Sequence, residues 1–296
     1  MNETENDSSG TPREPLQDIY KTTAEDVMKY GVITVERKTP VYQAIATLVE
    51  KNITGLPVVD NNMSLQGIIS EKDVLKLLHK TCRSSGVVEE FMTENVVSFN
   101  QEDNLANICD CLANNHFRRV AILNRDKVVS VISRADFIKI NKNKFRPPGL
   151  PESPRKDDVT ARDIMKRGLV TVKRQTPLYR VMELLSENNI TGLPVVDCDM
   201  QLEGIVTEKD ILGLLNDPDA KPCNVQDIMT KNVITFQQGD NLFDICHCLV
   251  NNSFRRVPIL DQGQLVGIIS RADIIDSILR YNACLLKRRY TDRRSS

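Results

Sequence analysis

The sequence predicts an α/β (α+β) protein made of four copies of one β-α-β-β-α unit, paired into two similar domains. Two levels of repetition predict this. Residues 23–140 reappear without insertion or deletion at 160–277, and more than half of the paired positions are identical. Each half is doubled in turn, because the segment that ends at Asp73 returns in altered form with its end at Asp136. Repetition at a fixed period indicates an architecture in which neighbouring copies complete one another's core.

The first half of the unit has the pattern of a strand followed by a helix. Residues 32–35 are a short apolar run, which favours a buried strand. Thr39 and Pro40 are typical of a helix start, with a hydroxyl as the N-cap and a proline at the first helical position. The next helix has one apolar face, which another part of the chain must cover. Its apolar residues recur at helical spacing: Val41, Ala44, Ile45, Leu48 and Val49.

The second half of the unit has the pattern of two strands and a second helix. Residues 56–59 and 67–69 are apolar runs joined by a turn at 60–62, which predicts an antiparallel pair. A single unit of this size has too little core to be stable alone, so adjacent copies should pair into compact domains with an approximate twofold axis. The second helix begins after Ser70, and its inward face should contain Val74, Leu75, Leu77 and Leu78.

The repeats divide the chain into seven segments. We expect a disordered start, two pairs of repeats, a proline-rich linker between the pairs and a basic tail. The expected boundaries are 1–22 for the start, 23–80 and 87–140 for the first pair, 141–159 for the linker, 160–216 and 224–281 for the second pair, and 282–296 for the tail.

The charge balance argues against a general attraction to polyanions. The chain has 39 basic and 40 acidic residues and a net charge of −1, so no global field draws it to nucleic acid or to a membrane. No apolar run approaches the length of a membrane span, and the acidic first residues do not resemble a signal peptide. We therefore expect a cytoplasmic protein without a membrane or nucleic-acid partner, whose eight cysteines are thiols.

Two cysteine pairs, Cys109/Cys111 and Cys246/Cys248, occupy equivalent positions in the two halves. Their duplication makes a shared zinc site one interpretation. Within a helix, however, residues two positions apart do not face the same way. Cys109 also falls on an apolar stripe of its helix, so we expect core packing and no metal site, with metal or redox chemistry as the alternative.

Each repeat has a Ser/Thr-x-x-Asp segment before its second helix. The structural interpretation is helix capping, in which the hydroxyl accepts an early helix N–H and the acidic residue is favoured by the helix dipole. The functional interpretation uses the same geometry, because a helix N-terminus can bind phosphate and a nearby carboxylate can accept both hydroxyls of a ribose. The four pairs are Ser70/Asp73, Ser133/Asp136, Thr207/Asp210 and Ser270/Asp273.

Paired arginines precede the middle strand of the second and fourth repeats, as Arg118-Arg119 and Arg255-Arg256. Arginines beside a buried strand must face solvent or an anion. A guanidinium group matches phosphate oxygens in two-point geometry. Two such pairs in twofold-related domains favour a shared polyanion site, and a salt-bridged surface is the alternative interpretation.

The motifs resemble those of the cystathionine-β-synthase (CBS) domain family. The resemblance rests on Leu-Pro-Val-Val-Asp, as at 56–60, followed by Gly-h-h-Ser/Thr-x-x-Asp, as at 67–73, where h is an apolar residue. It covers residues 23–140 and 160–277, hereafter module 1 and module 2. It implies that each pair of repeats forms a Bateman module and that the two modules pack into a disc. It also implies regulatory adenosyl ligands, namely AMP, ADP, ATP or S-adenosylmethionine, in clefts between paired repeats.

The same resemblance assigns roles to individual residues. The aspartates of the four Ser/Thr-x-x-Asp segments would hold ribose hydroxyls, and the Ser or Thr residues would lie near ribose and phosphate. The adenine base would lie near Thr54, Thr191 and the backbone of two apolar residues, and the arginine pairs would meet phosphates toward the disc centre. The expected nucleotide-binding residues are Ile33, Thr54, Ser70, Asp73, Arg118, Arg119, Ser133, Asp136, Val170, Thr191, Thr207, Asp210, Arg255, Arg256, Ser270 and Asp273.

The second repeat departs from the family pattern at two positions. Ser130 stands where the other three repeats have glycine, and Ala121 stands where they have proline. Each change alters how closely the backbone can approach a ligand. The cleft that uses Asp136 is therefore expected to differ most from the others.

No segment is typical of a catalytic site. The histidines His79, His116 and His247 have no nucleophile or paired carboxylates arranged around them, and a Gly-x-x-x-x-Gly-Lys loop is absent from the sequence. We expect a stand-alone sensor, not an enzyme, that binds an adenosyl ligand and acts on an unidentified effector protein, as a monomeric disc or a homodimer. The alternatives are a structural or oligomerising scaffold with empty or vestigial clefts, and a small enzyme with an unrecognised thiol site.

Overall fold

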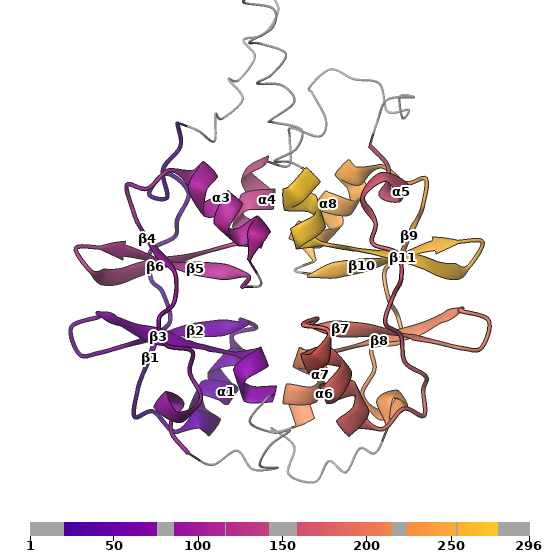
Figure 1. Ribbon diagram of the computed structural model, residues 1–296, viewed down its shortest axis with the longest axis horizontal. Helices are drawn as coiled ribbons and strands as arrows, with labels where there is room; N and C mark the ends of the chain where they lie inside the picture. Colours follow the sequence, from indigo (N-terminus) through magenta and orange to yellow (C-terminus); the bar gives the residue numbers. More distant parts are fainter. Residues whose placement is uncertain are drawn as a thin grey trace, which may run out of the picture.

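The computed structural model describes residues 21–75, 86–115, 117–141, 159–214, 224–252 and 254–277. Most of the N-terminal segment and of the linker, and the whole basic tail, lie outside these ranges, as do Leu77, Leu78, His79 and His116. The described residues form a flattened, four-lobed body, seen down its shortest axis in Figure 1. Module 1 forms one side of this disc and module 2 forms the other.

Each repeat contributes a helix followed by an antiparallel strand pair. The first repeat has β1 (Val35–Glu36), α1 (Val41–Glu50), β2 (Gly55–Val59) and β3 (Leu65–Ser70). The second has η1 (Val88–Glu90), β4 (Ser98–Asn100), α3 (Leu105–Asn114), β5 (Arg119–Asn124), β6 (Lys127–Ser133) and α4 (Arg134–Asn141). The third has α5 (Ala161–Ile164), α6 (Leu178–Glu187), β7 (Gly192–Val196), β8 (Leu202–Thr207) and α7 (Glu208–Gly213). The fourth has η4 (Val225–Asp227), β9 (Phe236–Gln237), α8 (Leu242–Asn251), β10 (Arg256–Asp261) and β11 (Gln264–Ser270).

The sheets confirm the predicted α+β fold and repeat the same strand register. In each antiparallel pair, the residue that begins the earlier strand lies opposite the Ser or Thr that precedes the second helix. Thus Arg119 pairs with Ser133 in β5–β6, and Arg256 pairs with Ser270 in β10–β11. This register places the arginine pairs beside the Ser-x-x-Asp segments.

The start of the first repeat differs from the sequence prediction. The strand β1 begins only at Val35, so most of the apolar run at 32–35 lies outside a strand. Helix α1 begins at Val41 with Pro40 as its cap residue. The hydroxyl of Thr39 accepts the N–H of Glu36 at 3.1 Å instead of a helix N–H. The Thr-Pro pair thus marks the helix start correctly, but threonine closes the preceding turn.

The opening segment of each repeat packs into the other repeat of its module. Thr23 forms an isolated bridge with Asn104 of the second repeat, and Ala24 is buried in that repeat's core. In exchange, Val87 bridges to Pro40 of the first repeat, and Val88 is buried there. Equivalent bridges occur in module 2. The two repeats of a module are therefore interlocked, as the sequence argument for pairing requires.

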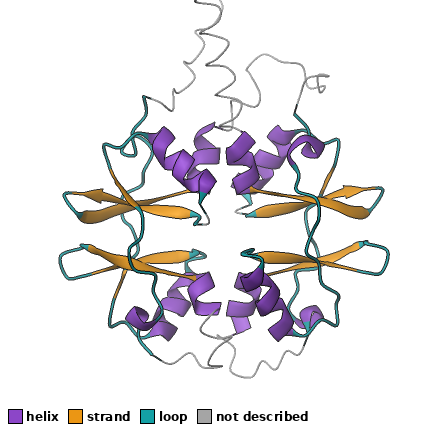
Figure 2. Cartoon of the chain, viewed as in Figure 1, coloured by secondary structure: helices purple, strands orange, loops and turns teal. Residues whose placement is uncertain are grey.

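The buried cores extend from one module into the other. One cluster joins the second and fourth repeats, where Leu105 and Ile108 of α3 share a core with Leu242 and Ile245 of α8. The other joins the first and third repeats through α1, α6 and α7. Figure 2 shows helices of both modules meeting at the top and at the bottom of the disc, with the sheets between these two helical layers. The apolar helix faces are thus covered by the strands of their own repeat and by helices of the other module.

The cysteines expected in the core lie there. Cys109 and Cys246 are fully buried in the cluster of the second and fourth repeats. Burial raises the pKa of the Cys246 thiol to about 12, because the thiolate would lose its hydration. This thiol is therefore protonated at neutral pH.

Reciprocal polar contacts join the modules near their first and third repeats. Lys209 Nζ donates to Asn52 Oδ1 at 2.8 Å, and Lys72 Nζ donates to Asn189 Oδ1 in the equivalent contact. Both asparagines follow a helix and adopt positive φ angles of 52° and 53°. The lysine of each module thus contacts the asparagine of the other module, which is the reciprocal pattern of a twofold interface. Within the described residues, no helix is long and apolar enough to cross a membrane.

Candidate functional site

All four Ser/Thr-x-x-Asp segments form the same cap. The aspartate carboxylate accepts both the backbone N–H and the hydroxyl of the Ser or Thr three residues earlier, with Oγ to Oδ2 distances of 2.6 Å at Ser133 and at Ser270. Thr207 and Asp210 form the same contacts at 2.7 Å. Burial raises the pKa of Asp210, while the hydrogen bonds from Thr207 oppose this rise. In the expected cap the hydroxyl accepts an early helix N–H, and among the described residues this bond is found at Thr207, which accepts from the Asp210 N–H at 3.4 Å. In all four repeats the hydroxyl instead contacts one oxygen of the carboxylate, which leaves the second oxygen to other partners.

A central cavity of about 860 Å³ lies between the two modules. It contains the Ser-x-x-Asp segments of the second and fourth repeats but not those of the first and third. Ile33, which is 41% exposed, and Val170 are also outside its lining. Ten of the expected site residues line this cavity: Thr54, Arg118, Arg119, Ser133, Asp136, Thr191, Arg255, Arg256, Ser270 and Asp273.

Cationic side chains predominate in the cavity wall. Six arginines and four lysines line it, against the three carboxylates of Asp136, Glu208 and Asp273. This excess occurs in a chain whose net charge is −1. The cavity is therefore a local concentration of positive charge in a nearly neutral protein, and it favours an anion.

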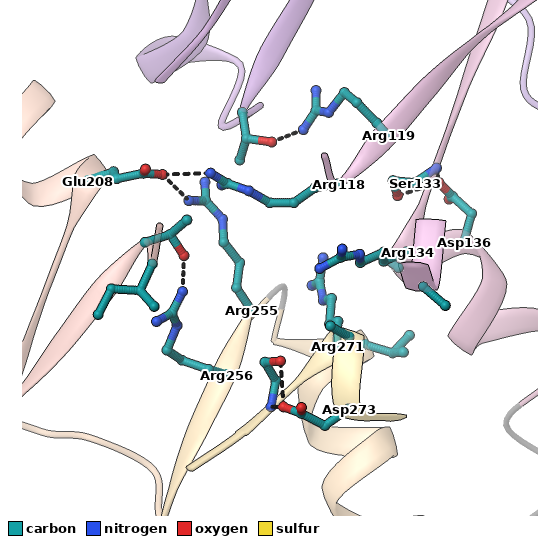
Figure 3. A pocket seen from close by; sticks show the side chains of 18 of the residues that line it. Arg118, Arg119, Ser133, Arg134, Asp136, Glu208, Arg255, Arg256, Arg271 and Asp273 are labelled. Carbon is teal, nitrogen blue, oxygen red and sulfur yellow. Dashed lines mark hydrogen bonds and ion pairs between the residues drawn. The ribbon is translucent and has the colours of Figure 1, made fainter. Parts of the chain in front are cut away.

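Arg118 and Arg255, which line the cavity, pair with two buried glutamates, Glu208 and Glu71. Figure 3 shows Glu208 between the two arginines. Arg118 Nη2 donates to Glu208 Oε2 at 2.9 Å, and Arg255 Nη2 donates to Glu71 Oε1 at 2.8 Å. Arg255 Nη1 is also 2.7 Å from Glu71 Oε2. Glu71 is 3% exposed and Glu208 is 2% exposed. Each ion pair joins an arginine of one module to a glutamate of the other.

The second arginine of each pair is held by the odd-numbered repeat of its own module. Arg119 Nη1 donates to the carbonyl oxygen of Gly55 at 2.7 Å, and its Nη2 donates to the Thr54 hydroxyl. Arg256 makes the equivalent contacts with Gly192, at 2.8 Å, and with Thr191. Burial lowers the pKa of both guanidinium groups to about 10, so both remain cationic at neutral pH.

Comparison with known proteins identifies the repeats. The family model described as the CBS domain matches residues 24–80, 88–143, 161–217 and 225–280. The chain belongs to the CBS domain family. This confirms the resemblance found in the motifs, and the paired CBS repeats are the two Bateman modules of the disc.

The similar proteins include an archaeal protein of comparable architecture. The uncharacterized protein MJ1225 of Methanocaldococcus jannaschii is 29% identical over 189 residues, which cover 63% of this chain and 68% of that protein. Its crystal structure covers 87% of this chain and all of that chain, with a TM-score of 0.78 at 22% identity, and so shares the fold. The chloroplastic CBS domain-containing protein CBSX1 of Arabidopsis thaliana is 32% identical over 159 residues, which cover 43% of this chain and 67% of that protein.

In each CBS repeat one charged residue directly follows the capping Ser or Thr, and its role was not predicted from the sequence. This position is glutamate in the odd repeats, as Glu71 and Glu208, and arginine in the even repeats, as Arg134 and Arg271. Arg134 donates to the carbonyl oxygens of Leu112 and Asn115, and Arg271 donates to that of Leu249, at 2.8–3.0 Å. The strict alternation of Glu and Arg was the available signal.

The second and fourth CBS repeats also differ where the opening segment of the preceding repeat approaches their last strand, β6 or β11. In the fourth repeat, Lys166 and Ile268 exchange two backbone hydrogen bonds, of 3.0 and 3.1 Å. Gly267 allows this approach, because a Cβ there would lie 2.4 Å from Met165 Sδ. In the second repeat the described residues show no such exchange, and the hydroxyl of Ser130 instead donates to the carbonyl oxygen of Lys29 at 2.7 Å. Serine therefore replaces a backbone contact with a side-chain contact.

A second difference separates the even CBS repeats. In the second repeat, β4 pairs with β5 at Ser98 and Ala121 and continues for two further residues. In the fourth repeat, the equivalent of Ala121 is Pro258. There β9 pairs only with Ile259 and Leu260, the two residues that follow the proline. Proline has no N–H to donate, so it shortens the parallel ladder by one pair. The second repeat thus has a longer β4 strand below its cleft.

Proposed function

We propose that this protein is a regulatory sensor that binds an anionic adenosyl ligand, of the class of AMP, ADP or ATP, in the cavity between its two modules. One observation carries the proposal: the cavity joins two Ser-x-x-Asp segments, at Asp136 and Asp273, to a wall with ten cationic side chains. In this proposal the aspartates accept ribose hydroxyls, and the guanidinium groups bind phosphate oxygens. S-adenosylmethionine, which carries a sulfonium cation, suits this wall less well than a phosphate does.

The position of the cavity gives the ligand a route to regulate a partner. Thr54, Arg118 and Asp136 come from module 1, and Thr191, Arg255 and Asp273 come from module 2, so one ligand contacts groups on both sides of the interface. A ligand shifts a conformational equilibrium only when it interacts differently with the two states. Phosphate bridging between the modules provides that difference. An effector protein that contacts both modules would then respond to occupancy.

One observation favours a second candidate, a scaffold with an empty cavity. Arg118 and Arg255 are already paired with Glu208 and Glu71, and Arg119 and Arg256 already have hydroxyl and carbonyl partners. Each of the four arginines that were expected to require an anion therefore already has a protein partner, although the buried Nη1 of Arg118 has no hydrogen bond. The scaffold candidate predicts that no adenosyl ligand stabilises the protein.

Ligand-induced thermal stabilisation separates the two candidates. The melting temperature should be measured with adenosine, AMP, ADP, ATP, GTP and S-adenosylmethionine. A ligand at about 100 times its dissociation constant stabilises the folded state by roughly 2.7 kcal/mol, which raises the melting temperature by several degrees. We expect the largest shifts with adenine nucleotides.

Two arginine variants test where the nucleotide binds. Arg271→Gln removes a cation from the cavity and should reduce the shift produced by nucleotides. Arg174→Gln is the matched control, because Arg174 pairs with Glu203 outside the cavity lining, and it should leave the shift unchanged. If no adenosyl ligand stabilises the wild-type protein, the scaffold candidate replaces the sensor.

A further inference from the structure

Two buried glutamates pair with arginines of the predominantly cationic cavity wall. Glu71 and Glu208 are the first residues after the capping Ser or Thr of the first and third repeats. Both carboxylates are almost fully buried. Buried carboxylates are rare unless they are paired, because removing the charge from water is costly. Their partners are the same arginines, Arg118 and Arg255, that face the cavity.

Each glutamate lies within ion-pair distance of both arginines. Glu208 Oε2 is 2.9 Å from Arg118 Nη2 and 3.8 Å from Arg255 Nη1. Glu71 Oε2 is 2.7 Å from Arg255 Nη1 and 3.7 Å from Arg118 Nη1. The four groups therefore form one cluster of two positive and two negative charges, centred on the interface between the modules.

A carboxylate and a phosphate are alternative partners for the same guanidinium edge. Arg255 Nη2 donates to Glu71 Oε1, and its Nη1 lies at ion-pair distance from Oε2, which has no hydrogen bond, so that edge already faces both carboxylate oxygens. A phosphate that is to be held there in the same two-point geometry must take the place of the glutamate. Arg118 has one short contact with Glu208 and offers a partly occupied edge. The glutamates thus stand where phosphate oxygens would bind.

We propose that Glu71 and Glu208 are resident counter-ions that compete with the ligand's phosphate for Arg118 and Arg255, and so determine which adenosyl ligands bind. This inference rests on the proposed function. A neutral ligand such as adenosine leaves the four-charge cluster intact. A nucleotide must exchange carboxylate for phosphate, and part of its binding free energy is used to separate the ion pairs. Ligands with more phosphate charge compete better, so the glutamates favour ADP and ATP over AMP.

The same exchange would change the contact between modules. The pair Arg118–Glu208 joins module 1 to module 2, and the pair Arg255–Glu71 joins them in the opposite direction. When phosphate takes the arginines, both cross-module ion pairs are lost, and the ligand replaces them. Each glutamate lies within ion-pair distance of both arginines. A phosphate that binds one arginine and displaces its glutamate therefore also changes the ion pairs of the other arginine. Two ligands in the cavity would therefore bind in a coupled manner.

Burial adds to the cost of releasing a glutamate. It raises the pKa of Glu208, and attraction to Arg118 and Arg255 opposes this rise, while Glu71 adds to it. Loss of a guanidinium partner therefore leaves a carboxylate that either takes up a proton or moves toward water.

Glutamine variants test the competition directly. Glu71→Gln and Glu208→Gln keep the size of the side chain and an oxygen acceptor, but they remove the charge that competes with phosphate. Titration calorimetry should compare wild type, both single variants and the double variant with adenosine, AMP, ATP and inorganic pyrophosphate. We expect the double variant to bind ATP and pyrophosphate at least about tenfold more tightly, with adenosine changed by less than about twofold. The matched control is Glu203→Gln, a glutamate that pairs with Arg174 outside the cavity lining.

The design keeps the inference testable if the double variant does not fold. Glu208→Asp retains the charge and shortens the side chain by one methylene, so it weakens the contact with Arg118 without leaving that arginine uncompensated. It should raise the affinity for ATP by about threefold, a change of roughly 0.65 kcal/mol. Unchanged or weaker binding of ATP and pyrophosphate by folded glutamine or aspartate variants overturns the inference, as does an equal gain for adenosine.

The pyrophosphate arm distinguishes this inference from the proposed function. If neither adenosine nor any nucleotide binds to any variant, the sensor proposal fails. A gain in pyrophosphate affinity in the glutamine variants would still support the role of the glutamates as counter-ions. A nucleotide that binds tightly and equally to wild type and variants would support the sensor and reject the counter-ions.

Discussion

The second and fourth repeats contribute equivalent halves of the central cavity, yet they contact the equivalent lysines Lys29 and Lys166 differently. These lysines belong to the opening segments of the first and third repeats. In the fourth repeat, Gly267 lets the segment around Lys166 approach the last strand, and Lys166 Nζ lies 3.1 Å from Asp273 Oδ1. In the second repeat, Ser130 holds the equivalent Lys29 through its carbonyl oxygen. Met165 is buried beside Gly267, whereas its counterpart Met28 is only half-buried. One added side chain has thus changed the spacing between two backbone segments.

This difference shows which features of the duplicated site vary and which do not. The capping serine, the aspartate and the two arginines are the same in both repeats, and so are their hydrogen bonds. The variation lies in residues that set backbone separation, namely Ser130 against Gly267 and Ala121 against Pro258. The two halves therefore offer the same functional groups at different spacings, and they are not expected to bind a ligand equally.

The largest expected effect comes from the aspartates. Asp273→Asn keeps the cap but removes a charged acceptor for ribose hydroxyls, and a charged hydrogen bond contributes roughly 1.5–3 kcal/mol. Affinity for AMP should fall at least about tenfold. Asp136→Asn should cost less, because its half of the cavity is the altered one. Calorimetry of both variants measures the difference.

Asp73→Asn and Asp210→Asn are matched controls for these variants. Both aspartates form the same cap in the first and third repeats but do not line the cavity. We expect them to leave AMP affinity nearly unchanged, with a stability cost similar to that of the other two variants. Equal losses of affinity in all four variants would show that the central cavity is not the main binding site.

Gly267→Ser should make the fourth repeat resemble the second. The added Cβ would lie 2.4 Å from Met165 Sδ and 3.0 Å from Met165 Cβ, so the segment itself must move. Overpacking of this kind costs about 1–3 kcal/mol. Chemical denaturation measures this loss, and Gly239→Ser is the control because no atom lies within 4 Å of a Cβ at that position. A loss no greater than that of the control would mean that the close approach does not require glycine.

Ser130→Gly is the reverse exchange and should have the smallest effect. It removes one buried hydrogen bond, which contributes about 0.5–1.5 kcal/mol. It also lets Lys29 approach Val131 and form the backbone pair that the fourth repeat has, which offsets part of the loss. Hydrogen exchange should therefore show slower exchange of the Lys29 or Val131 amide in the variant. Unchanged or faster exchange would show that Ser130 alone does not keep the two segments apart.

The sequence predicted the units better than their assembly. The Ser/Thr-x-x-Asp segments could be interpreted because the cap involves only residues three positions apart, and the arginine pairs were correctly associated with the centre of the disc. The pairing of the first repeat with the third could not be deduced, since the apolar face of α1 fits any similar helix. An acidic residue in the first turn of a helix is also typical of an exposed position. Glu71 and Glu208 are nevertheless buried, each paired with an arginine of the other module.

The cores shared between modules have a consequence for how the chain folds during synthesis. Domains generally fold as units while the chain is made at ~5–20 residues per second, the N-terminal one first. Here the part of each core in module 1 that packs against module 2 has no cover until residues 160–277 are complete, a delay on the order of ten seconds. During that time the exposed helix faces of two nascent chains could associate with each other in place of module 2. The linear order of the repeats thus leaves part of the apolar surface of the first half exposed while the second half is made.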